Sequence, residues 1–260
     1  MKRLGLALSA GGPRGIAHVG VIQALVDAGL PISAIAGTSV GAYVGGLFAA
    51  GIPLPEIARF WQEMGFTQAA RFLLPTFPWR GWSSGGELRR ALQAMIGDRR
   101  IEELSLPFVA VAADLHSGQP VAIDRGPLVD AIQASISVPG LFVPVELDGR
   151  TFIDGGVAHP LPVDAVRTLG AEVVVAVDVL VPPEEKRLAR INVFTVLFQM
   201  ATIFQKRIAH LEAEVLRPEV LIVPDFTERA PTYVDVGAGA EIGYRAAQAA
   251  LPQIRTLLSA

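Results

Sequence analysis

One segment of the chain, residues 32–50, restricts the fold more than any other. Its first residues, Ile32 to Ala36, are mostly apolar and follow a proline, which is typical of a buried strand. From Val40 onward, small and apolar residues recur at helical spacing. Between them lies a G-x-S-x-G sequence, Gly37-Thr38-Ser39-Val40-Gly41. In this pattern a serine occupies a sharp turn from a strand into a helix, so the segment predicts an α/β fold.

The serine of this turn is a candidate nucleophile. In such a turn the hydroxyl stands at the open end of the sheet, where the amides of the following helix favour negative charge. Gly37 and Gly41 would let neighbouring backbone approach where a Cβ would clash. Because the chain has 26 glycines in 260 residues, the pentapeptide alone also fits a plain structural turn. Its position between a strand and a helix favours a catalytic Ser39.

A glycine-rich loop precedes this segment. Leu4 to Ser9 predict a strand, Ala10 to Gly15 a loop, and Ile16 to Ala28 a helix that ends at Gly29. A strand, a helix and a second strand form a βαβ unit with parallel strands. The loop and the serine turn would therefore share the carboxyl edge of the sheet, where open α/β sheets bind ligands.

Three interpretations of this loop are open. A phosphate-binding P-loop would end in Gly-Lys-Ser/Thr, which is absent, and a dinucleotide fingerprint would have a glycine in place of Ala10. In the third, the amides of Gly11 and Gly12 form an oxyanion hole for a carbonyl attacked by Ser39. Pro13 has no N–H to donate. Arg14 would hold the loop or neutralise an anion, unless it is an ordinary surface residue.

The other segments alternate between helix and strand patterns, which favours one domain over residues 1–260, with core motifs in 4–178 and C-terminal helices and a last strand in 190–260. Predicted helices cover residues 53–64, 87–96, 128–136, 192–210 and 238–258. Predicted strands cover residues 106–113, 120–123, 142–147, 150–153, 173–180 and 220–223. An aromatic, proline-broken run from Phe66 to Trp82 fits a cap over a pocket, contact with a membrane surface, or ordinary packing against the core.

The composition of the chain favours contact with apolar molecules and argues against several classes of protein. Hydrophobic residues make up 51% of the chain, and the mean hydropathy is +0.44, which hints at an apolar pocket or a face that meets lipid. No uninterrupted stretch of 18 apolar residues predicts a transmembrane span. The net charge of −3 argues against nucleic acid as a partner, and the lack of cysteine excludes thiol catalysis. The apolar segment at the start is short and continues into the glycine-rich loop, which is typical of a first core strand rather than a signal peptide. We therefore predict a cytoplasmic protein.

A serine nucleophile needs a group that accepts its proton. Asp154-Gly155-Gly156 places a carboxylate at the end of a predicted strand, and Asp154 could accept the proton directly if its pKa were raised in a water-poor site. A triad of Ser39, Asp154 and His159 is the alternative. The other histidines are expected to be non-catalytic, because none lies beside a recognisable motif. These are His18, His116 and His210.

Together these motifs resemble the patatin-like phospholipase family, in particular its small, stand-alone bacterial members. The resemblance rests on Gly11-Gly12-Pro13-Arg14-Gly15, the Ser39 pentapeptide and Asp154-Gly155-Gly156, in this order. It runs from about Leu4 to Asp178 and includes Ser137-Val138-Pro139-Gly140-Leu141-Phe142 and His159-Pro160-Leu161-Pro162-Val163. Ala10 departs from the pattern, where many members have glycine, and so does His159, where asparagine is expected.

The resemblance implies a three-layer α/β/α sandwich with a mostly parallel central sheet. It also implies a Ser39–Asp154 dyad without histidine, with Gly11 and Gly12 as the oxyanion hole. The implied supporting residues are Arg14, Gly15, Gly37, Gly41, Gly155 and Gly156. The implied activity is hydrolysis of fatty-acyl esters of lipids through an acyl-enzyme, with no metal or cofactor.

Other functions stay open at this point. One is a lipid-binding or regulatory protein with little turnover, and another is a nucleotide-binding α/β protein. A lipid substrate would also allow peripheral contact with the inner membrane surface. The sequence does not indicate the lipid, the ester position, the chain length or the oligomeric state.

Overall fold

One eight-stranded sheet forms the centre of the molecule in the computed structural model, which describes residues 2–63, 83–180, 193–227 and 236–260. The strands are β1 (Leu4–Leu8), β2 (Ile32–Thr38), β3 (Phe108–Asp114), β4 (Pro120–Ile123), β5 (Val145–Leu147), β6 (Arg150–Asp154), β7 (Val173–Val177) and β8 (Val220–Ile222). Their order is β5-β6-β3-β2-β1-β7-β8, and β4 pairs with β3. Strands β3, β2, β1, β7 and β8 are parallel, whereas β4 and β6 run antiparallel to β3, and β5 antiparallel to β6.

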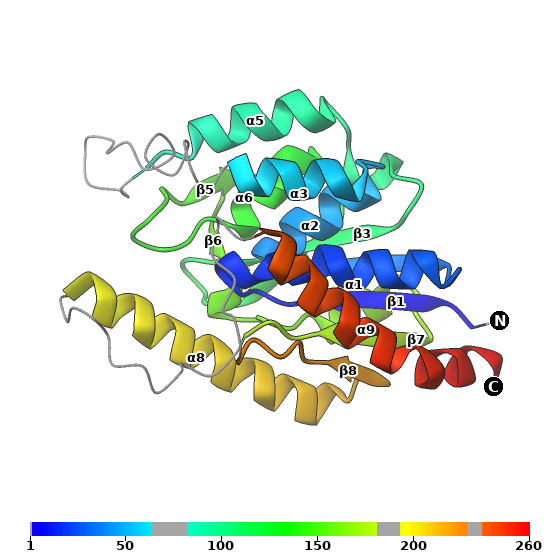
Figure 1. Cartoon of the computed structure of the whole chain (residues 1–260). Helices are drawn as coiled ribbons and strands as arrows, with labels where there is room; N and C mark the ends of the chain where they lie inside the picture. The colour runs from blue at the N-terminus through cyan, green and yellow to red at the C-terminus, as the bar shows by residue number, and fades with distance from the viewer. Residues whose placement is uncertain (1, 64–82, 181–192, 228–235) are drawn as a thin grey trace.

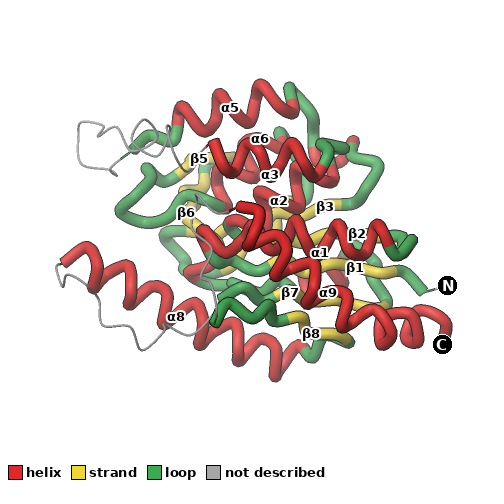
Figure 2. Tube along the Cα trace, in the orientation of Figure 1, coloured by secondary structure: helices red, strands yellow, loops and turns green. Residues whose placement is uncertain are grey.

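Helices cover both faces of this sheet (Figures 1 and 2). They are α1 (Ile16–Asp27), α2 (Val40–Ala49), α3 (Leu54–Glu63), α5 (Gly86–Ile96), α6 (Leu128–Ser135), α7 (Val163–Thr168), α8 (Val193–Leu216) and α9 (Val236–Ser259). Helices α1, α2, α3, α5, α6 and α9 contribute to one buried cluster, and α7 and α8 contribute to the cluster on the opposite face. This confirms the predicted three-layer α/β/α fold with a mostly parallel sheet.

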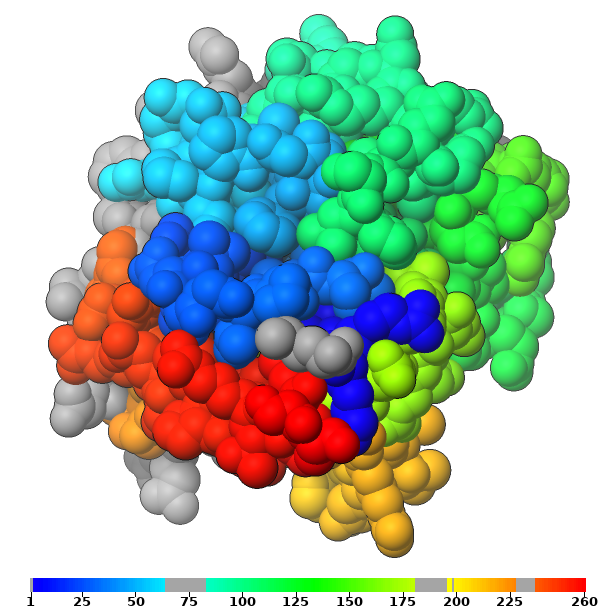
Figure 3. Space-filling model, turned by 90° about the vertical axis from the view of Figure 1, so that its right-hand side faces the viewer, coloured from blue at the N-terminus to red at the C-terminus, as the bar shows by residue number. Residues whose placement is uncertain are grey.

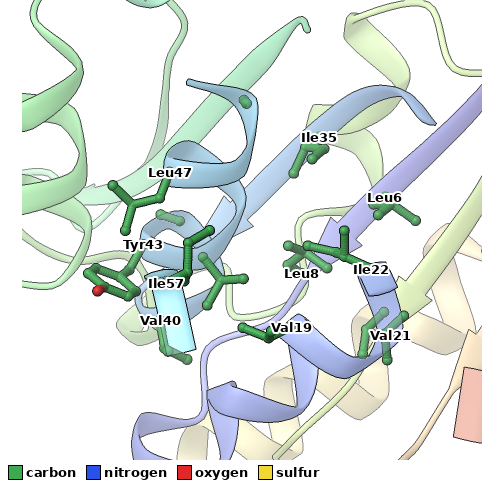
Figure 4. Close-up of a cluster of buried hydrophobic side chains, with 14 of the residues drawn as sticks. Leu6, Leu8, Val19, Val21, Ile22, Ile35, Val40, Tyr43, Leu47 and Ile57 are labelled. Carbon is green, nitrogen blue, oxygen red and sulfur yellow. The ribbon is translucent and has the colours of Figure 1, made fainter. Parts of the chain in front are cut away.

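The two faces of the central strands carry side chains of different size. In β1, Leu4, Leu6 and Leu8 belong to the cluster beneath α1 and α2, whereas Ala7 belongs to the cluster beneath α7. Figure 4 shows Leu6 and Leu8 lying close to Ile22 of α1. This separation follows from the two-residue period of a strand, and the small side chain leaves room for a helix close to the sheet.

Both chain ends lie away from the carboxyl edge of the parallel strands (Figure 1). The Lys2 N–H donates to the Leu258 carbonyl oxygen at 3.2 Å, and α9 packs along α1. Figure 3 looks onto this end of the molecule, where the last helix lies beside the first residues of the chain. The loops that follow β1, β2 and β6 therefore lie at the opposite edge, away from both chain ends.

Most predicted elements are confirmed, and the structure differs from the prediction at a few places. Helix α8 continues to Leu216, beyond the predicted end at residue 210, because its last turns pack on the sheet through Ala213 and Leu216. The strand predicted over 142–147 begins only at Val145. Helix α7 was not predicted, because six residues are too few to show a helical period. The run from Phe66 to Trp82 lies outside the described residues.

None of the helices in the described ranges is long and apolar enough to cross a lipid bilayer. The predicted cytoplasmic location and the single domain stay predictions.

Candidate active site

Ser39 lies at a strained turn between β2 and α2. Its backbone angles are φ 55° and ψ −121°, a conformation that non-glycine residues rarely adopt. The two flanking glycines make this turn possible. A Cβ at Gly37 would collide with the backbone of Gly41, and a Cβ at Gly41 would collide with the Leu8 carbonyl oxygen at the end of β1. The structure therefore has the nucleophile-elbow geometry that the pentapeptide predicts.

A second serine, Ser135 at the end of α6, holds the backbone of this turn. The Ser39 N–H donates to Ser135 Oγ at 2.8 Å, and the Ser135 hydroxyl donates to the Val111 carbonyl oxygen at 2.6 Å. Ser135 is fully buried. Its hydroxyl thus connects the strained amide of the elbow to β3. No local pattern in the sequence indicates this role, because the two serines are 96 residues apart.

Asp154 is the last residue of β6 and lies next to Ser39. The Ser39 hydroxyl donates to Asp154 Oδ2 at 2.6 Å, and the Gly156 N–H donates to Oδ1 at 2.7 Å. Antiparallel pairing places Asp154 opposite Ala112 of β3, and its own N–H donates to the Ser137 carbonyl oxygen. The carboxylate is therefore fixed at both oxygens and at the backbone.

The environment of Asp154 alters the pKa of its carboxyl group. Its side chain is buried, and burial disfavours the charged form; the hydrogen bonds from Ser39 and Gly156 offset this only in part. The result is that the pKa of Asp154 is raised to about 6. A carboxylate with this pKa is ionised near pH 7 and is a better proton acceptor than an exposed aspartate.

The turn after Asp154 packs tightly on the elbow. A Cβ at Gly155 would collide with the Val111 carbonyl oxygen, and one at Gly156 would lie 2.8 Å from Gln205 Nε2 of α8. The Thr38 hydroxyl donates to the His159 carbonyl oxygen at 2.9 Å. Both glycines thus occur where another segment approaches closely.

The glycine-rich loop after β1 is anchored to three other segments before it reaches Gly11. The Ser9 carbonyl oxygen accepts from His18 Nε2–H at 2.9 Å, Ser9 Oγ accepts from the Val179 N–H at 2.9 Å, and the Ala10 N–H donates to the Pro160 carbonyl oxygen at 2.9 Å. These bonds fix the loop relative to α1, the end of β7 and the turn after Asp154.

The loop then runs beside the elbow. Gly11 packs against Val179, and Gly12 has a φ of 55°, which glycine adopts without strain. A Cβ at Gly15 would collide with Val40, the residue directly after Ser39. Arg14 lies close enough to affect the pKa of Asp178, which burial raises and which Lys206 and Arg14 partly lower. The loop and the elbow are therefore direct neighbours.

His159 is fully engaged by two carboxylates and does not complete a triad. Its Nδ1 and Nε2 lie 2.5 Å from Glu212 Oε1 and 2.6 Å from Asp164 Oδ1. Burial disfavours the charged ring, but its interactions with Asp164 and Glu212 outweigh this effect. The hydrogen bonds that the two ring N–H groups donate to these carboxylates, together with the negative charges of the carboxylates, raise the pKa of His159 to about 9. A doubly protonated ring at neutral pH has no free nitrogen to accept a proton from Ser39.

None of the remaining histidines is hydrogen-bonded to Ser39 or Asp154 in the described residues. Burial, partly offset by the bond to Ser9, lowers the pKa of His18 to about 4, so its ring is neutral. His116 lies in an exposed turn, and His210 lies on the exposed side of α8 beside Glu214. Within the described parts of the chain, no group of three or more His, Asp or Glu side chains is arranged to hold a metal ion.

We expect the replacement of Ser135 by alanine to slow the reaction of Ser39 without unfolding the chain. The change would leave the strained Ser39 N–H buried without its acceptor and would cost about 1–3 kcal/mol of unfolding free energy. Urea denaturation and the rate of labelling by a fluorophosphonate ester would measure both effects. Ser137→Ala is a matched control, because the Ser137 hydroxyl, just past the end of α6, donates only to the Gln133 carbonyl oxygen. Equal labelling rates for the two variants would contradict this role of Ser135.

The pair of carboxylates around His159 predicts a pH-dependent stability. We expect His159→Ala to lower the unfolding free energy by about 3 kcal/mol, since it leaves the largely buried Glu212 without its cation. The pKa of His159 is raised when folded, so its stabilisation is complete below its ordinary pKa of 6.5 and is lost as the pH rises through about 9. Urea denaturation from pH 6 to 10 should show the wild type and the variant converging. His210→Ala, which removes only an exposed ion pair, should show no such trend.

Comparison with known proteins adds a family match to this geometry. The sequence pattern described as patatin-like phospholipase matches residues 6–167, more than half of the chain. An uncharacterized NTE family protein of Mycobacterium tuberculosis is 43% identical over 175 residues, which cover 67% of this chain and 48% of that protein. The lysophospholipase nte1 of Aspergillus fumigatus is 38% identical over 183 residues, which cover 68% of this chain and 12% of that protein. The chain thus spans about half the length of the mycobacterial relative and far less of the fungal one.

Solved structures show the same fold. VipD from Legionella pneumophila superposes with a TM-score of 0.51 at 15% identity, over 96% of this chain and 66% of that chain. A chain of the heterodimeric complex ExoU–SpcU from Pseudomonas aeruginosa superposes with a TM-score of 0.50 at 16% identity, over 100% of this chain and 52% of that chain. At this identity, the likeness concerns the fold alone.

Proposed function

Because the chain belongs to the patatin-like phospholipase family, we propose that it is a serine acyl hydrolase that cleaves fatty-acyl esters of lipids. The observation that carries this proposal is the 2.6 Å hydrogen bond from the Ser39 hydroxyl to Asp154 at a strained elbow. The bond joins a candidate nucleophile to a buried carboxylate whose pKa is raised to about 6. This is the pairing that a two-residue acyl hydrolase requires.

In the proposed first step, Asp154 accepts the hydroxyl proton while Ser39 Oγ attacks the acyl carbonyl carbon. The negative charge that develops on the carbonyl oxygen would be stabilised by the amides of Gly11 and Gly12. The C–O bond of the ester then breaks, and the leaving alcohol takes the proton from Asp154. This step leaves the fatty-acyl group bound to Ser39 as an ester.

In the proposed second step, a water molecule attacks the acyl-enzyme. Asp154 accepts a proton from that water, a second tetrahedral oxyanion forms, and the fatty acid leaves as Ser39 regains its proton from Asp154. The dyad returns to its starting state. Arg14, Gly15, Gly37, Gly41, Gly155 and Gly156 would act only by holding the loop, the elbow and the turn after Asp154 in place.

The relatives suggest the class of lipid. One of them is named a lysophospholipase, so single-chain phospholipids belong among the substrates to be tested, beside two-chain phospholipids. A protein that binds lipid with little turnover is the competing function, and it would leave the same site without a measurable rate.

The test is hydrolysis in water enriched in ¹⁸O. The purified chain would be incubated with phosphatidylcholine or lysophosphatidylcholine, and the released fatty acid would be analysed by mass spectrometry. We expect free fatty acid that carries one ¹⁸O atom, in amounts exceeding the protein many times. Lipid binding at one equivalent, with no fatty acid released from either lipid, would instead indicate the binding protein.

A further inference from the structure

Helix α8 exposes an apolar face in its first half. The exposed fractions of these side chains lie between 44% and 58%, although all of them are large and apolar. They are Val196, Leu197, Met200, Ile203 and Phe204. The last four follow Val196 by one, four, seven and eight residues, a spacing that places all five on one side of the helix. We call this set the apolar face of α8. Such a continuous exposed set is uncommon on a soluble surface and marks a site of interaction.

The same helix contacts the turn that follows Asp154. Gln205 approaches Gly156, Glu212 Oε1 lies 2.5 Å from His159 Nδ1, and Glu212 Oε2 accepts the Leu161 N–H at 2.9 Å. The first half of α8 projects from the body on the side where β6 ends and α1 begins (Figure 1). The first half of α8 therefore lies at the edge of the molecule that carries Ser39 and Asp154.

Charge along α8 favours a negatively charged partner near this face. Lys206 and Arg207 directly follow it, and no Asp or Glu occurs between residues 193 and 211. At 3.6 residues per turn, Arg207 lies on the same side of the helix as Met200 and Ile203. Apolar side chains bordered by cations are the features of helices that lie in the interface of a membrane with anionic lipids.

We propose that the apolar face of α8 docks on an anionic phospholipid surface and brings the dyad to its lipid substrate. This rests on the proposed function, since a lipid hydrolase must reach an ester that lies at the edge of a bilayer or micelle. The helix would lie along the surface with its apolar side chains between the lipid headgroups, while Arg207 contacts phosphates. A surface formed by a second copy of the chain is the competing occupant.

The absence of cysteine in the chain allows a direct test of where lipid is contacted. Single cysteines at Leu197 or Phe204 would carry a nitrobenzoxadiazole fluorophore, and one at Val26 would serve as the control. Val26 is 46% exposed and lies at the far end of α1. With vesicles of phosphatidylcholine and phosphatidylglycerol, we expect a blue shift at Leu197→Cys and Phe204→Cys, with quenching by lipids that carry nitroxides on their acyl chains. We expect neither at Val26→Cys.

Two other results of that experiment would overturn the proposal. One is vesicle binding without a shift at either α8 position. The other is a shift that appears without vesicles and grows with protein concentration, which would assign the face to a second copy of the chain. Co-sedimentation with these vesicles would measure how strongly the chain binds them. The double variant Leu197→Ser/Phe204→Ser should bind them at least about 10-fold more weakly, whereas Val26→Ser should bind as the wild type does.

A soluble short-chain ester separates this proposal from the proposed function. If the chain hydrolyses no ester at all but α8 enters vesicles, the proposed function fails and the docking surface stands. If the chain hydrolyses the soluble ester and the α8 variants bind vesicles as the wild type does, the docking surface fails and the proposed function stands.

Discussion

Replacing Ser39 with alanine is expected to reduce ester hydrolysis by at least about 10⁴-fold. The reason is that the hydroxyl bonded to Asp154 at 2.6 Å would be the atom that forms the acyl-enzyme, and no other described hydroxyl is bonded to that carboxylate. The fold should survive, because the change removes one oxygen and leaves the Ser39 N–H bonded to Ser135. Initial rates on a soluble ester, with circular dichroism as a check of folding, would measure this.

Two matched serines make the Ser39 experiment specific. Ser137→Ala and Ser83→Ala each remove a buried serine hydroxyl, and neither hydroxyl is bonded to Asp154. We expect both to retain most of the hydrolytic rate. Hydrolysis by Ser39→Ala at a rate similar to these controls would contradict the assignment of the nucleophile.

Replacing Asp154 with asparagine is expected to reduce the rate by about 10²–10⁴-fold, the range for the loss of a general base. Asparagine keeps the size of the side chain and an oxygen that can accept the Gly156 N–H, but it cannot take a proton from Ser39. The experiment would compare kcat and KM of Asp154→Asn and of Asp164→Asn. Asp164 touches His159 rather than Ser39, so its variant should stay within a few-fold of the wild type.

The pH dependence of the same reaction distinguishes a base from a structural acceptor. Only the carboxylate form of Asp154 accepts a proton, so kcat/KM of the wild type should rise as the pH passes through about 6 and then level off. Burial, the main cause of the raised pKa, predicts that this rise lies above the ordinary range for aspartate. A profile that is flat from pH 4 to 8, or one that Asp164→Asn shifts, would contradict the role of Asp154.

The strands and turns that carry the site could be predicted because their signals are local. The Ser39 pentapeptide predicts an elbow, since glycine at both flanking positions allows backbone contacts that a Cβ would prevent. Asp148-Gly149 lies between two predicted strands, and an Asp-Gly pair in this position predicts the hairpin between β5 and β6, which ends at Asp154. Each of these features depends on residues that are neighbours in the chain.

The supporting contacts could not be predicted, because they join segments far apart in the sequence. Ser135 reaches Ser39 across 96 residues, and Glu212 reaches His159 across 53. Sequence alone left His159 as a possible third member of a triad, because nothing local shows that both of its nitrogens face other carboxylates. Helix α8 had no predicted role for a related reason. Its contacts with the turn after Asp154 join residues far apart in the sequence, so they are visible only in the folded chain.

The central claim, that Ser39 is a nucleophile activated by Asp154, is tested most directly by its covalent reaction with a fluorophosphonate ester. Intact-mass spectrometry would follow wild type, Ser39→Ala, Asp154→Asn and His159→Ala over time. We predict one adduct on wild type, none on Ser39→Ala, much slower labelling of Asp154→Asn, and labelling of folded His159→Ala that stays well above that of Asp154→Asn. An adduct on Ser39→Ala at the wild-type rate, or no adduct on the folded wild type, would contradict the account.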